Sequence, residues 1–416
     1  MQPYIKYLTA RLSAVILLLC MVPACPAQVK PGVEVLRDGG FAQLQGKRVG
    51  LLTNPTGVDR NLKSTIDILH EAPEVTLTAL FAPEHGVRGD VTAGATVDSG
   101  TDPTTGVKIH SLYGRTRKPT ADMLADVDAV VYDIQDNGCR SYTFISSMGK
   151  VMEACAEQGK EFIVLDRPNP LGGEKVEGNL AEKDCISFVS QYPIPYIYGL
   201  TPGELATYIN ENGLLSGGRK VALTVVPMEG WKRSMTYDET GLPWVLTSPH
   251  IPNAATTLYY PATGIMGELD YASIGVGYTM PFKLICAGWI DAEELCRRLQ
   301  ALNLPGVAWR PIHIKPYYGF GKGTSMHGVE LYITDPSKAP LTLIQFYVMQ
   351  ELADMYPQHA ALKTATAERL TMFDKVCGSK QIRTLFGRRH RVADIIDYWN
   401  KDAEAFRTVS APYYLY

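Results

Sequence analysis

The first half of the chain alternates between short apolar runs and stretches with helical spacing. Apolar runs that end at a turn cover residues 47–57, 75–86, 128–138 and 161–170, and each has the length of a strand. Residues 64–72 and 145–160 instead space their apolar side chains for helices. The runs at 129–134 and 162–166 are almost wholly apolar, which suits strands buried on both faces. The pattern predicts an α/β fold with a doubly wound, mainly parallel sheet and helices on each side.

The second half mixes both periods and is less regular. Residues 292–302, 342–356 and 391–406 have helical spacing, and 220–228 and 328–335 read as strands. Thr201, Pro202 and Glu204 form a capping box that opens a helix. Because residues 180–200 have no clear period, we place a boundary there, with a first domain at 28–190 and a smaller α/β or α+β domain at 191–416. Residues 231–282, rich in Gly, Pro, Tyr and Trp, are expected to be an irregular functional surface.

The N-terminal residues have the pattern of an export signal. Lys6 and Arg11 precede an apolar run at 12–22, which is shorter than the roughly 20 residues of a membrane-spanning helix but fits a signal peptide. Two processing routes remain open. Cleavage after Ala27 gives a signal peptide at 1–27, whereas a lipobox ending at Cys25 gives a lipid-anchored protein. Both predict an exported protein, periplasmic or membrane-anchored, without a transmembrane span in the mature chain.

Composition narrows the class of protein. The chain has 416 residues, 46% of them hydrophobic and 20% charged, with a net charge of −3. This apolar content excludes a disordered chain, and the charge argues against a nucleic-acid partner. The cysteines beyond the leader form no CxxC pair; Cys155 and Cys296 are expected to be buried thiols, and one or two disulfide bridges are left open.

The motifs of common cofactors are missing from the sequence. The first strand is not followed by GxGxxG, no Walker A motif is present, and the glycine-rich stretch 319–323 has no evident strand before it or helix after it. GxSxG and HExxH are absent as well. His85 adjoins Glu84, but neighbours on a strand point to opposite faces and would not chelate one ion. We therefore expect neither a cofactor nor a metal.

Polar residues follow each predicted strand of the first half. In an open parallel sheet, the carboxyl ends of the strands share one edge, and ligands bind outside it. We therefore expect these clusters to gather around one hollow. They are Asn54, then Glu84 with His85, then Asp133 with Gln135 and Asp136, then Asp166 with Arg167.

Carboxylates carry the candidate chemistry of this hollow. Glu84 follows a proline among apolar and small residues, a setting that suits a general acid. Arg140 and Arg167 are candidate anchors for an anionic substrate, although Arg167 next to Asp166 also fits a structural ion pair. The candidate partners for Glu84 are Asp133, Asp136, Asp166, Glu177 and Glu268, and the tyrosines that lie near turns, where rings can stack on sugars, are Tyr142, Tyr192, Tyr196, Tyr198 and Tyr278. Together these features suggest a glycoside hydrolase.

Long motifs at the same places resemble a known family. The matching stretches are LLTNPTGVD (51–59), LFAPEHGVRGD (80–90), VYDIQDNGCRSYTF (131–144), LDRPNPLGGEKVEGN (165–179), PIPYIYGLTPGELA (193–206), SPHIP (248–252) and PYYLY (412–416). On these motifs the chain resembles the NamZ-type exo-β-N-acetylmuramidases, and the resemblance covers essentially the whole mature chain.

The resemblance implies a Rossmann-like domain joined to a smaller α/β domain, with the active site between them. It implies removal of terminal N-acetylmuramic acid from the non-reducing end of peptidoglycan fragments, with Glu84 as the acid/base. Other motif positions expected to line the cleft are Asn54, His85, Asp136, Arg140, Tyr142, Asp166, Arg167, Asn169 and Glu177. For the group that supports Glu84 in catalysis, Asp136, Glu177 and Glu268 stay open.

The second half departs from the family pattern at 268–282. Glu268 is kept, but two family arginines are replaced by Val276 and Met280 and an asparagine by Tyr271. If those arginines hold the lactyl carboxylate of muramic acid, their replacement affects the specificity for that sugar more than catalysis at Glu84. The primary hypothesis is an exported exo-glycosidase acting on peptidoglycan-derived saccharides. The alternatives are a non-catalytic or altered-specificity wall-sugar binder and, less favoured, an esterase or amidase.

Overall fold

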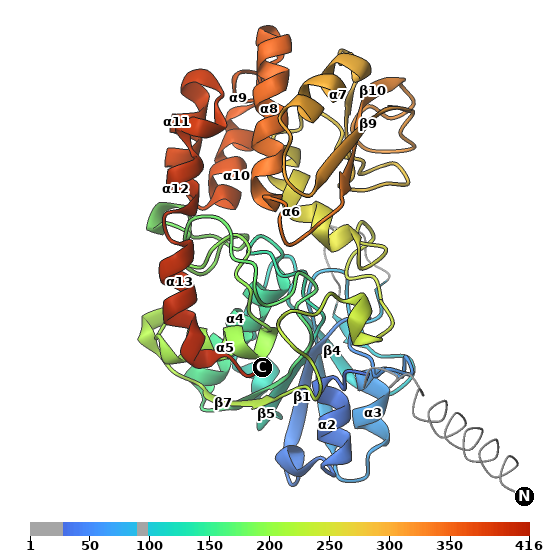
Figure 1. Cartoon of the computed structure of the whole chain (residues 1–416). Coiled ribbons are helices and arrows are strands. Elements are labelled where there is room, and N and C mark those ends of the chain that lie inside the picture. Colours follow the sequence, from blue (N-terminus) through green and yellow to red (C-terminus); the bar gives the residue numbers. More distant parts are fainter. Residues whose placement is uncertain (1–27, 90–98) are drawn as a thin grey trace, which may run out of the picture.

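The computed structural model describes residues 28–89 and 99–416. The predicted signal peptide at 1–27, including Cys25, lies outside these residues. Within the described part of the chain, no helix is both long and apolar enough to cross a membrane. Two domains stack on each other, one built from the first half of the chain and one from the second (Figure 1).

The first domain is a seven-stranded sheet in the order β3-β4-β2-β1-β5-β6-β7, parallel except for β3. The predicted doubly wound, mainly parallel α/β sheet is thereby confirmed. Its strands are β1 (Arg48–Thr53), β2 (Thr76–Ala82), β3 (Gly100–Thr101), β4 (Lys108–Ser111), β5 (Ala129–Asp133), β6 (Glu161–Leu165) and β7 (Ala222–Val226).

Helices cover both faces of this sheet. Helix α2 (Gly32–Asp38) contacts β6 and β7, and α3 (Thr65–Glu71) contacts β1 and β2. Helix α4 (Phe144–Gln158) contacts β5 and β6, and α5 (Pro202–Glu211) contacts β6 and β7. All five residues of β5 are buried, as its apolar sequence predicts. The predicted capping box at the start of α5 is present, with Thr201 and Glu204 bonding to each other's backbone.

The sheet of the first domain continues past residue 190, where we expected the boundary. α5 packs on the sheet, and β7 pairs with β6 in parallel from Glu161↔Ala222 to Leu165↔Val226. The aperiodic stretch at 180–200 is thus an irregular excursion within the domain. Its backbone bonds to other loops, for example Ile197 with Glu177, instead of to a strand of the sheet.

The second domain has a three-stranded antiparallel sheet, β8-β10-β9, formed by β8 (Leu284–Ala287), β9 (Val307–Ile314) and β10 (Met326–Ile333). Its helices are α6 (Thr256–Gly267), α7 (Ala292–Ala301), α8 (Ile344–Met355), α9 (Ala361–Thr364), α10 (Ala367–Cys377), α11 (Lys380–Arg389), α12 (Ile396–Asn400) and α13 (Ala403–Ser410). The expected smaller α/β domain is therefore present.

Three local expectations are corrected by the structure. The helix α6 lies inside 231–282, which was expected to be irregular; Pro261 and two glycines in it hide the helical pattern. The predicted helix at 391–406 is split into a 3₁₀ turn, α12 and α13. The glycine-rich stretch 319–323 does follow a strand, since it connects β9 to β10 as a hairpin loop.

The chain returns to the first domain at its end. α13 descends from the second domain, and the final residues lie against the first (Figure 1). Ala403 and Phe406 of α13 join the core cluster that also holds Tyr208 of α5. The two domains are therefore linked by the connection before α6 and by this returning C-terminal segment.

Candidate active site

The carboxyl ends of β4, β2, β1, β5 and β6 meet at one edge of the sheet, because these strands are parallel neighbours. Polar residues follow each strand in this order along the edge. They are Tyr113 after β4, Glu84 and His85 after β2, Asn54 after β1, Asp133 to Asp136 at β5, and Asp166 to Asn169 after β6. The two halves of this edge differ in burial and in bonding.

Glu84 lies at the β2–β4 half of the edge and is partly exposed. The Tyr113 hydroxyl donates to its Oε1 at 2.9 Å, and the Thr143 hydroxyl donates to its Oε2 at 3.0 Å. Burial, followed by the negative charge of Glu84, raises the pKa of Tyr113 to about 12, so this phenol stays a neutral donor. Both carboxylate oxygens are thereby held while the group keeps access to solvent.

The connection between the domains covers this part of the edge. The Tyr142 hydroxyl donates to Thr247 Oγ1 at 2.7 Å. Burial raises the pKa of Tyr142 strongly, and the charges of Asp136 and Glu84 add to this. Burial and then the charge of His85 lower the pKa of His250.

Asp136 lies deeper, with 2% of its surface exposed. Its Oδ2 accepts hydrogen bonds from the Tyr198 hydroxyl and from the backbone N–H of Gly138. Gly138 has a φ of 79°, and a Cβ there would come within 2.3 Å of Asn169 Oδ1, so only glycine fits this turn. Burial raises the pKa of Asp136 to about 6. In the described part of the chain, its Oδ1 has no hydrogen-bond partner.

Asn54 lies between these two sites, at the end of β1. Its Oδ1 accepts hydrogen bonds from the backbone N–H of Thr56 at 3.0 Å and from the Thr56 hydroxyl at 2.6 Å. Its Nδ2 is buried and has no hydrogen-bond partner among the described residues, and the same is true of Gln135 Oε1. Buried polar atoms of this kind have spare capacity for water or a polar ligand.

Asp133 and Arg167 form an ion pair in the β5–β6 half of the edge. Arg167 Nη2 lies 2.9 Å from Asp133 Oδ2, and Thr65 also donates to this carboxylate. Arg167 Nη2 further donates to the Val58 carbonyl at 2.7 Å. Arg167 therefore bonds to the protein itself, which fits the structural alternative for this residue, although its partner is Asp133 and not Asp166.

Asp166 is fully buried at the end of β6 and joins distant parts of the chain. Its carboxylate accepts hydrogen bonds from the hydroxyls of Thr201 and Tyr416, both at 2.7 Å, and from the backbone N–H groups of Gly203 at 2.8 Å and Arg167 at 3.0 Å. Burial raises its pKa to about 6. This side chain anchors the start of α5 and the end of the chain.

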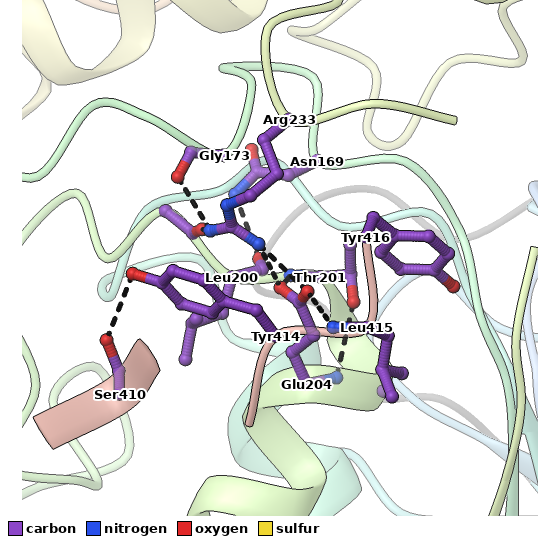
Figure 2. Close-up of polar contacts among 12 residues, drawn as sticks. Asn169, Gly173, Leu200, Thr201, Glu204, Arg233, Ser410, Tyr414, Leu415 and Tyr416 are labelled. Atoms are coloured by element: carbon purple, nitrogen blue, oxygen red, sulfur yellow. Dashed lines mark hydrogen bonds and ion pairs between the residues drawn. The ribbon is translucent and has the colours of Figure 1, made fainter. Parts of the chain in front are cut away.

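The C-terminal segment docks beside Glu204 and Arg233, as Figure 2 shows. Arg233 donates to both carboxylate oxygens of Glu204 at 2.8 and 2.9 Å, and the Tyr414 ring lies 3.6 Å from its guanidinium carbon. The backbone N–H of Leu415 donates to Glu204 Oε1 at 2.9 Å. The PYYLY motif at 412–416 thus closes the first domain structurally.

Arg140 is fully buried at the junction of the domains. Its guanidinium donates to Ser190 Oγ and to the carbonyls of Asn179, Ile194 and Val376 at 2.6–3.1 Å. Burial lowers its pKa to about 10. Since these donors bind protein oxygens, Arg140 holds the first domain to α10 of the second.

Three other predicted site residues, Asn169, Glu177 and Glu268, lie on later segments of the chain. Asn169 bonds to the Leu200 carbonyl and the Leu171 N–H, both at 2.9 Å. Glu177 accepts from the N–H and the hydroxyl of Thr342, both at 2.8 Å, and forms an ion pair with Lys175. Glu177 also lines a cavity of about 530 Å³ between the domains. Glu268 ends α6, where burial raises its pKa.

Tyr113 and Thr143, which bond to Glu84, were not singled out from the sequence as site residues, and neither were Arg117, beside Tyr113, and His250. The exposed Arg117 guanidinium lies 4.1 Å from the ring centroid of Phe188 and 5.8 Å from that of Tyr113. The ion pairs found among the described residues do not include Arg117. A signal for Tyr113 was present, because β4 also ends at this edge; its short, mixed sequence hid the strand.

The positions where the sequence departs from the family pattern lie in the second domain. Val276 packs partly buried against the main core cluster of that domain, and Met280 packs against Leu284, Cys286 and their neighbours. Tyr271 is buried. The six cysteines of the described residues, including Cys155 and Cys296, are free and buried.

Comparison with known proteins identifies the family. Residues 49–255 match the N-terminal domain of exo-β-N-acetylmuramidase NamZ, and residues 258–416 match its C-terminal domain. The peptidoglycan β-N-acetylmuramidase NamZ of Bacillus subtilis (strain 168) is 44% identical over 389 residues, which cover 94% of this chain and 92% of that protein.

Solved structures agree with this result. Crystal structures of two DUF1343 family proteins from Bacteroides fragilis NCTC 9343 have TM-scores of 0.90 and 0.76 to this chain, with 56% and 27% identity. Each comparison covers 94% of this chain and 99% of the other. Both domains thus match in order and over nearly their whole length, and the chain belongs to the NamZ exo-β-N-acetylmuramidase family of glycoside hydrolases, formerly DUF1343.

Proposed function

We propose that this protein is an exported exo-glycosidase that removes terminal N-acetylmuramic acid from peptidoglycan fragments, with Glu84 as the general acid/base. The observation that carries the proposal is the position of Glu84. Its carboxyl group is partly exposed at the carboxyl edge of a parallel sheet, where ligands bind, and two hydroxyls orient it. The family to which the chain belongs supports the reaction type.

In this mechanism, Glu84 protonates the glycosidic oxygen as the bond to the departing sugar breaks. The Tyr113 and Thr143 hydroxyls fix the plane of its carboxyl group, so that the proton points at the substrate from the start. After the departing sugar has left with that proton, the Glu84 carboxylate takes a proton from the water that attacks the anomeric carbon, which restores the acid.

Asp136 supports this reaction as a positioning residue. Only 2% of it is exposed, whereas Glu84 is partly exposed. It acts through Tyr198, which it holds by a hydrogen bond, and through the field that it exerts on Tyr142. Glu177 is bound to Thr342 and Lys175, and Glu268 follows the last residue of α6.

Arg117 is the proposed anchor for the carboxylate of the substrate. Arg140 and Arg167 are engaged by protein oxygens, whereas the guanidinium of Arg117 is exposed and held beside Tyr113 by ring contacts. A planar guanidinium binds a carboxylate through two parallel hydrogen bonds. A lactyl carboxylate on the sugar at Glu84 would therefore bind the guanidinium of Arg117 near Tyr113. This cation would take the place of the two family arginines that are replaced here by Val276 and Met280.

The test is digestion of defined peptidoglycan fragments with mass-spectrometric detection of the products. Release of free N-acetylmuramic acid, one residue at a time and only from non-reducing ends, is the expected result. Tight calorimetric binding of the fragments without any product would instead favour the wall-sugar binder. Loss of an acyl group or a peptide with the glycan intact would favour the esterase or amidase.

Export forms a separate part of the proposal, and it rests on the charged and apolar pattern of residues 1–27. The expected result is that the mature protein is found outside the cytoplasm after cell fractionation. N-terminal sequencing distinguishes cleavage after Ala27 from acylation at Cys25, and Cys25→Ser abolishes membrane association only in the second case. A full-length protein in the cytoplasmic fraction would contradict export.

A further inference from the structure

An exposed aromatic surface lies on the hairpin loop between β9 and β10. Tyr317 is 65% exposed and Tyr318 is 49% exposed. They are adjacent in sequence and directly precede the glycine-rich stretch 319–323, which does not have the sequence context of a nucleotide-binding loop. Large aromatic side chains left in water at neighbouring positions commonly mark a binding surface.

This loop is held in place from below. The backbone N–H of Tyr317 donates to the Gly277 carbonyl at 2.8 Å, and that of Gly323 donates to the Pro316 carbonyl at 2.9 Å. Gly277 has a φ of 94°, and a Cβ there would come within 2.0 Å of the Tyr318 carbonyl oxygen. A binding surface that is already ordered loses little conformational entropy when a ligand binds.

A third tyrosine, Tyr278, completes the surface. The ring of Tyr278 stacks on that of Tyr317, with centroids 5.6 Å apart and planes 18° apart. These two rings border an open cavity of about 640 Å³, whose walls also include His313, Lys315, Ser325 and His327. Flat aromatic faces suit the C–H faces of sugar rings, and the polar groups around them suit sugar hydroxyls and amides.

The charge of the cavity also favours an anionic saccharide. Of the described residues that line it, Lys315 is a cation, His313 and His327 lie with ring centroids 5.0 Å apart, and none is acidic. Glu293 on α7 approaches His313 from outside, with 3.9 Å between the His313 Nε2 and a carboxylate oxygen. A cavity of this size holds a ligand of one or two sugar rings.

The aromatic loop is connected to the proposed catalytic site through His250. The Tyr318 hydroxyl lies 2.9 Å from His250 Nε2, and the two rings stack with centroids 6.1 Å apart. Three residues before His250, Thr247 accepts a hydrogen bond from Tyr142 at 2.7 Å, and the residue after Tyr142, Thr143, donates to Glu84 at 3.0 Å. A path therefore leads from Glu84 past His250 and Tyr318 to the Tyr317 and Tyr278 rings.

We propose that Tyr317 and Tyr278 form a subsite for the departing part of the glycan, the sugar units beyond the bond that is cleaved. This rests on the proposed function, because it takes the terminal sugar to lie at Glu84. A substrate with several sugar units would then contact both domains at once. A substrate with one sugar and a small aryl leaving group would not reach the subsite.

The experiment compares two substrates: a chromogenic aryl N-acetylmuramoside and a defined peptidoglycan tetrasaccharide with terminal N-acetylmuramic acid. We expect Tyr317→Ala to lower kcat/KM for the tetrasaccharide about 10-fold, the scale of one lost aromatic contact. For the aryl glycoside, the same variant should stay within about twofold of the wild type. Tyr317→Phe, which keeps the ring, should behave as wild type with both substrates.

Val409→Ala serves as the matched control, because it also shortens an exposed apolar side chain, 52% exposed, but on α13. It should change neither activity. Equal losses on both substrates, or no loss on the tetrasaccharide, would overturn the subsite. If the wild type cleaves neither substrate, the proposed function fails, and calorimetry with the tetrasaccharide then tests the subsite alone. In that case, equal affinity of the wild type and Tyr317→Ala would overturn it.

Discussion

The two halves of the sheet edge use the same residue types for opposite purposes. At the β2–β4 half, Glu84 and Arg117 are at least partly exposed and contact hydroxyls or rings. At the β5–β6 half, Asp166 and Arg167 are buried and bonded to the protein. Position at the end of a parallel strand therefore delivers a polar group to the edge, but exposure and spare bonding capacity decide whether it can act on a ligand.

The largest expected effect on activity is that of Glu84→Gln. The amide keeps the shape of the side chain but cannot donate and take back a proton, so kcat/KM for the aryl muramoside should fall at least about 100-fold. The midpoint of thermal unfolding should change little, since Glu84 is partly exposed. Steady-state kinetics with thermal unfolding in parallel checks both parts.

The β5–β6 half should respond in the opposite manner. Asp166→Ala leaves the Thr201 and Tyr416 hydroxyls and the Gly203 N–H without their common acceptor. Each buried donor left unpaired costs about 1–3 kcal/mol, so the free energy of unfolding should fall by at least about 2 kcal/mol. The protein that remains folded should keep its kcat. Urea denaturation followed by fluorescence measures the loss, and a stable but inactive variant would contradict the distinction between the halves.

Asp166→Asn tests the structural role of Asp166 through the pH dependence of the free energy of unfolding. Burial raises the pKa of Asp166 to about 6 in the folded state, above its unfolded value near 4, so the folded protein binds this proton more tightly. Its contribution to stability is then complete below pH 4 and is lost as the pH rises through 6. Because Asn does not titrate, the stability of the variant relative to wild type should rise by up to about 3 kcal/mol between pH 4 and pH 7. A constant difference over that range would argue against a raised pKa.

The sequence predicts what depends on neighbouring residues and fails where distant ones decide. The buried strands and α4 follow from local periodicity, and Glu84 follows from its place after β2. The structural role of Asp166, however, depends on Tyr416, which lies 250 residues further along the chain. Arg140 similarly bonds to Val376, 236 residues away, and no local pattern distinguishes such a buried cation from a ligand anchor.

Arg117 and Arg115 test the comparison for cations. Arg117→Ala should raise KM for the aryl muramoside about 10-fold, because one charge-assisted contact to the lactyl carboxylate is lost at a solvent-exposed position. An aryl N-acetylglucosaminide, which lacks that carboxylate, should bind both forms equally. Arg115→Ala removes a second exposed guanidinium two positions away and should leave KM unchanged. Equal effects of the two variants would point to general electrostatic attraction.

The smallest expected effect concerns the orientation of Glu84. Thr143→Val keeps the branched shape of the side chain but removes the hydroxyl that donates to Glu84 Oε2 at 3.0 Å. Since Thr143 makes no side-chain capping bond to α4, the helix should lose little stability. The remaining Tyr113 bond holds the carboxyl group less firmly, so kcat should fall several-fold while KM stays the same. Thr384→Val, an exposed threonine on α11, provides the control. If Thr143→Val changed KM alone, the Thr143 hydroxyl would contact the substrate. The orientation of Glu84 would then be assigned to the Tyr113 hydroxyl.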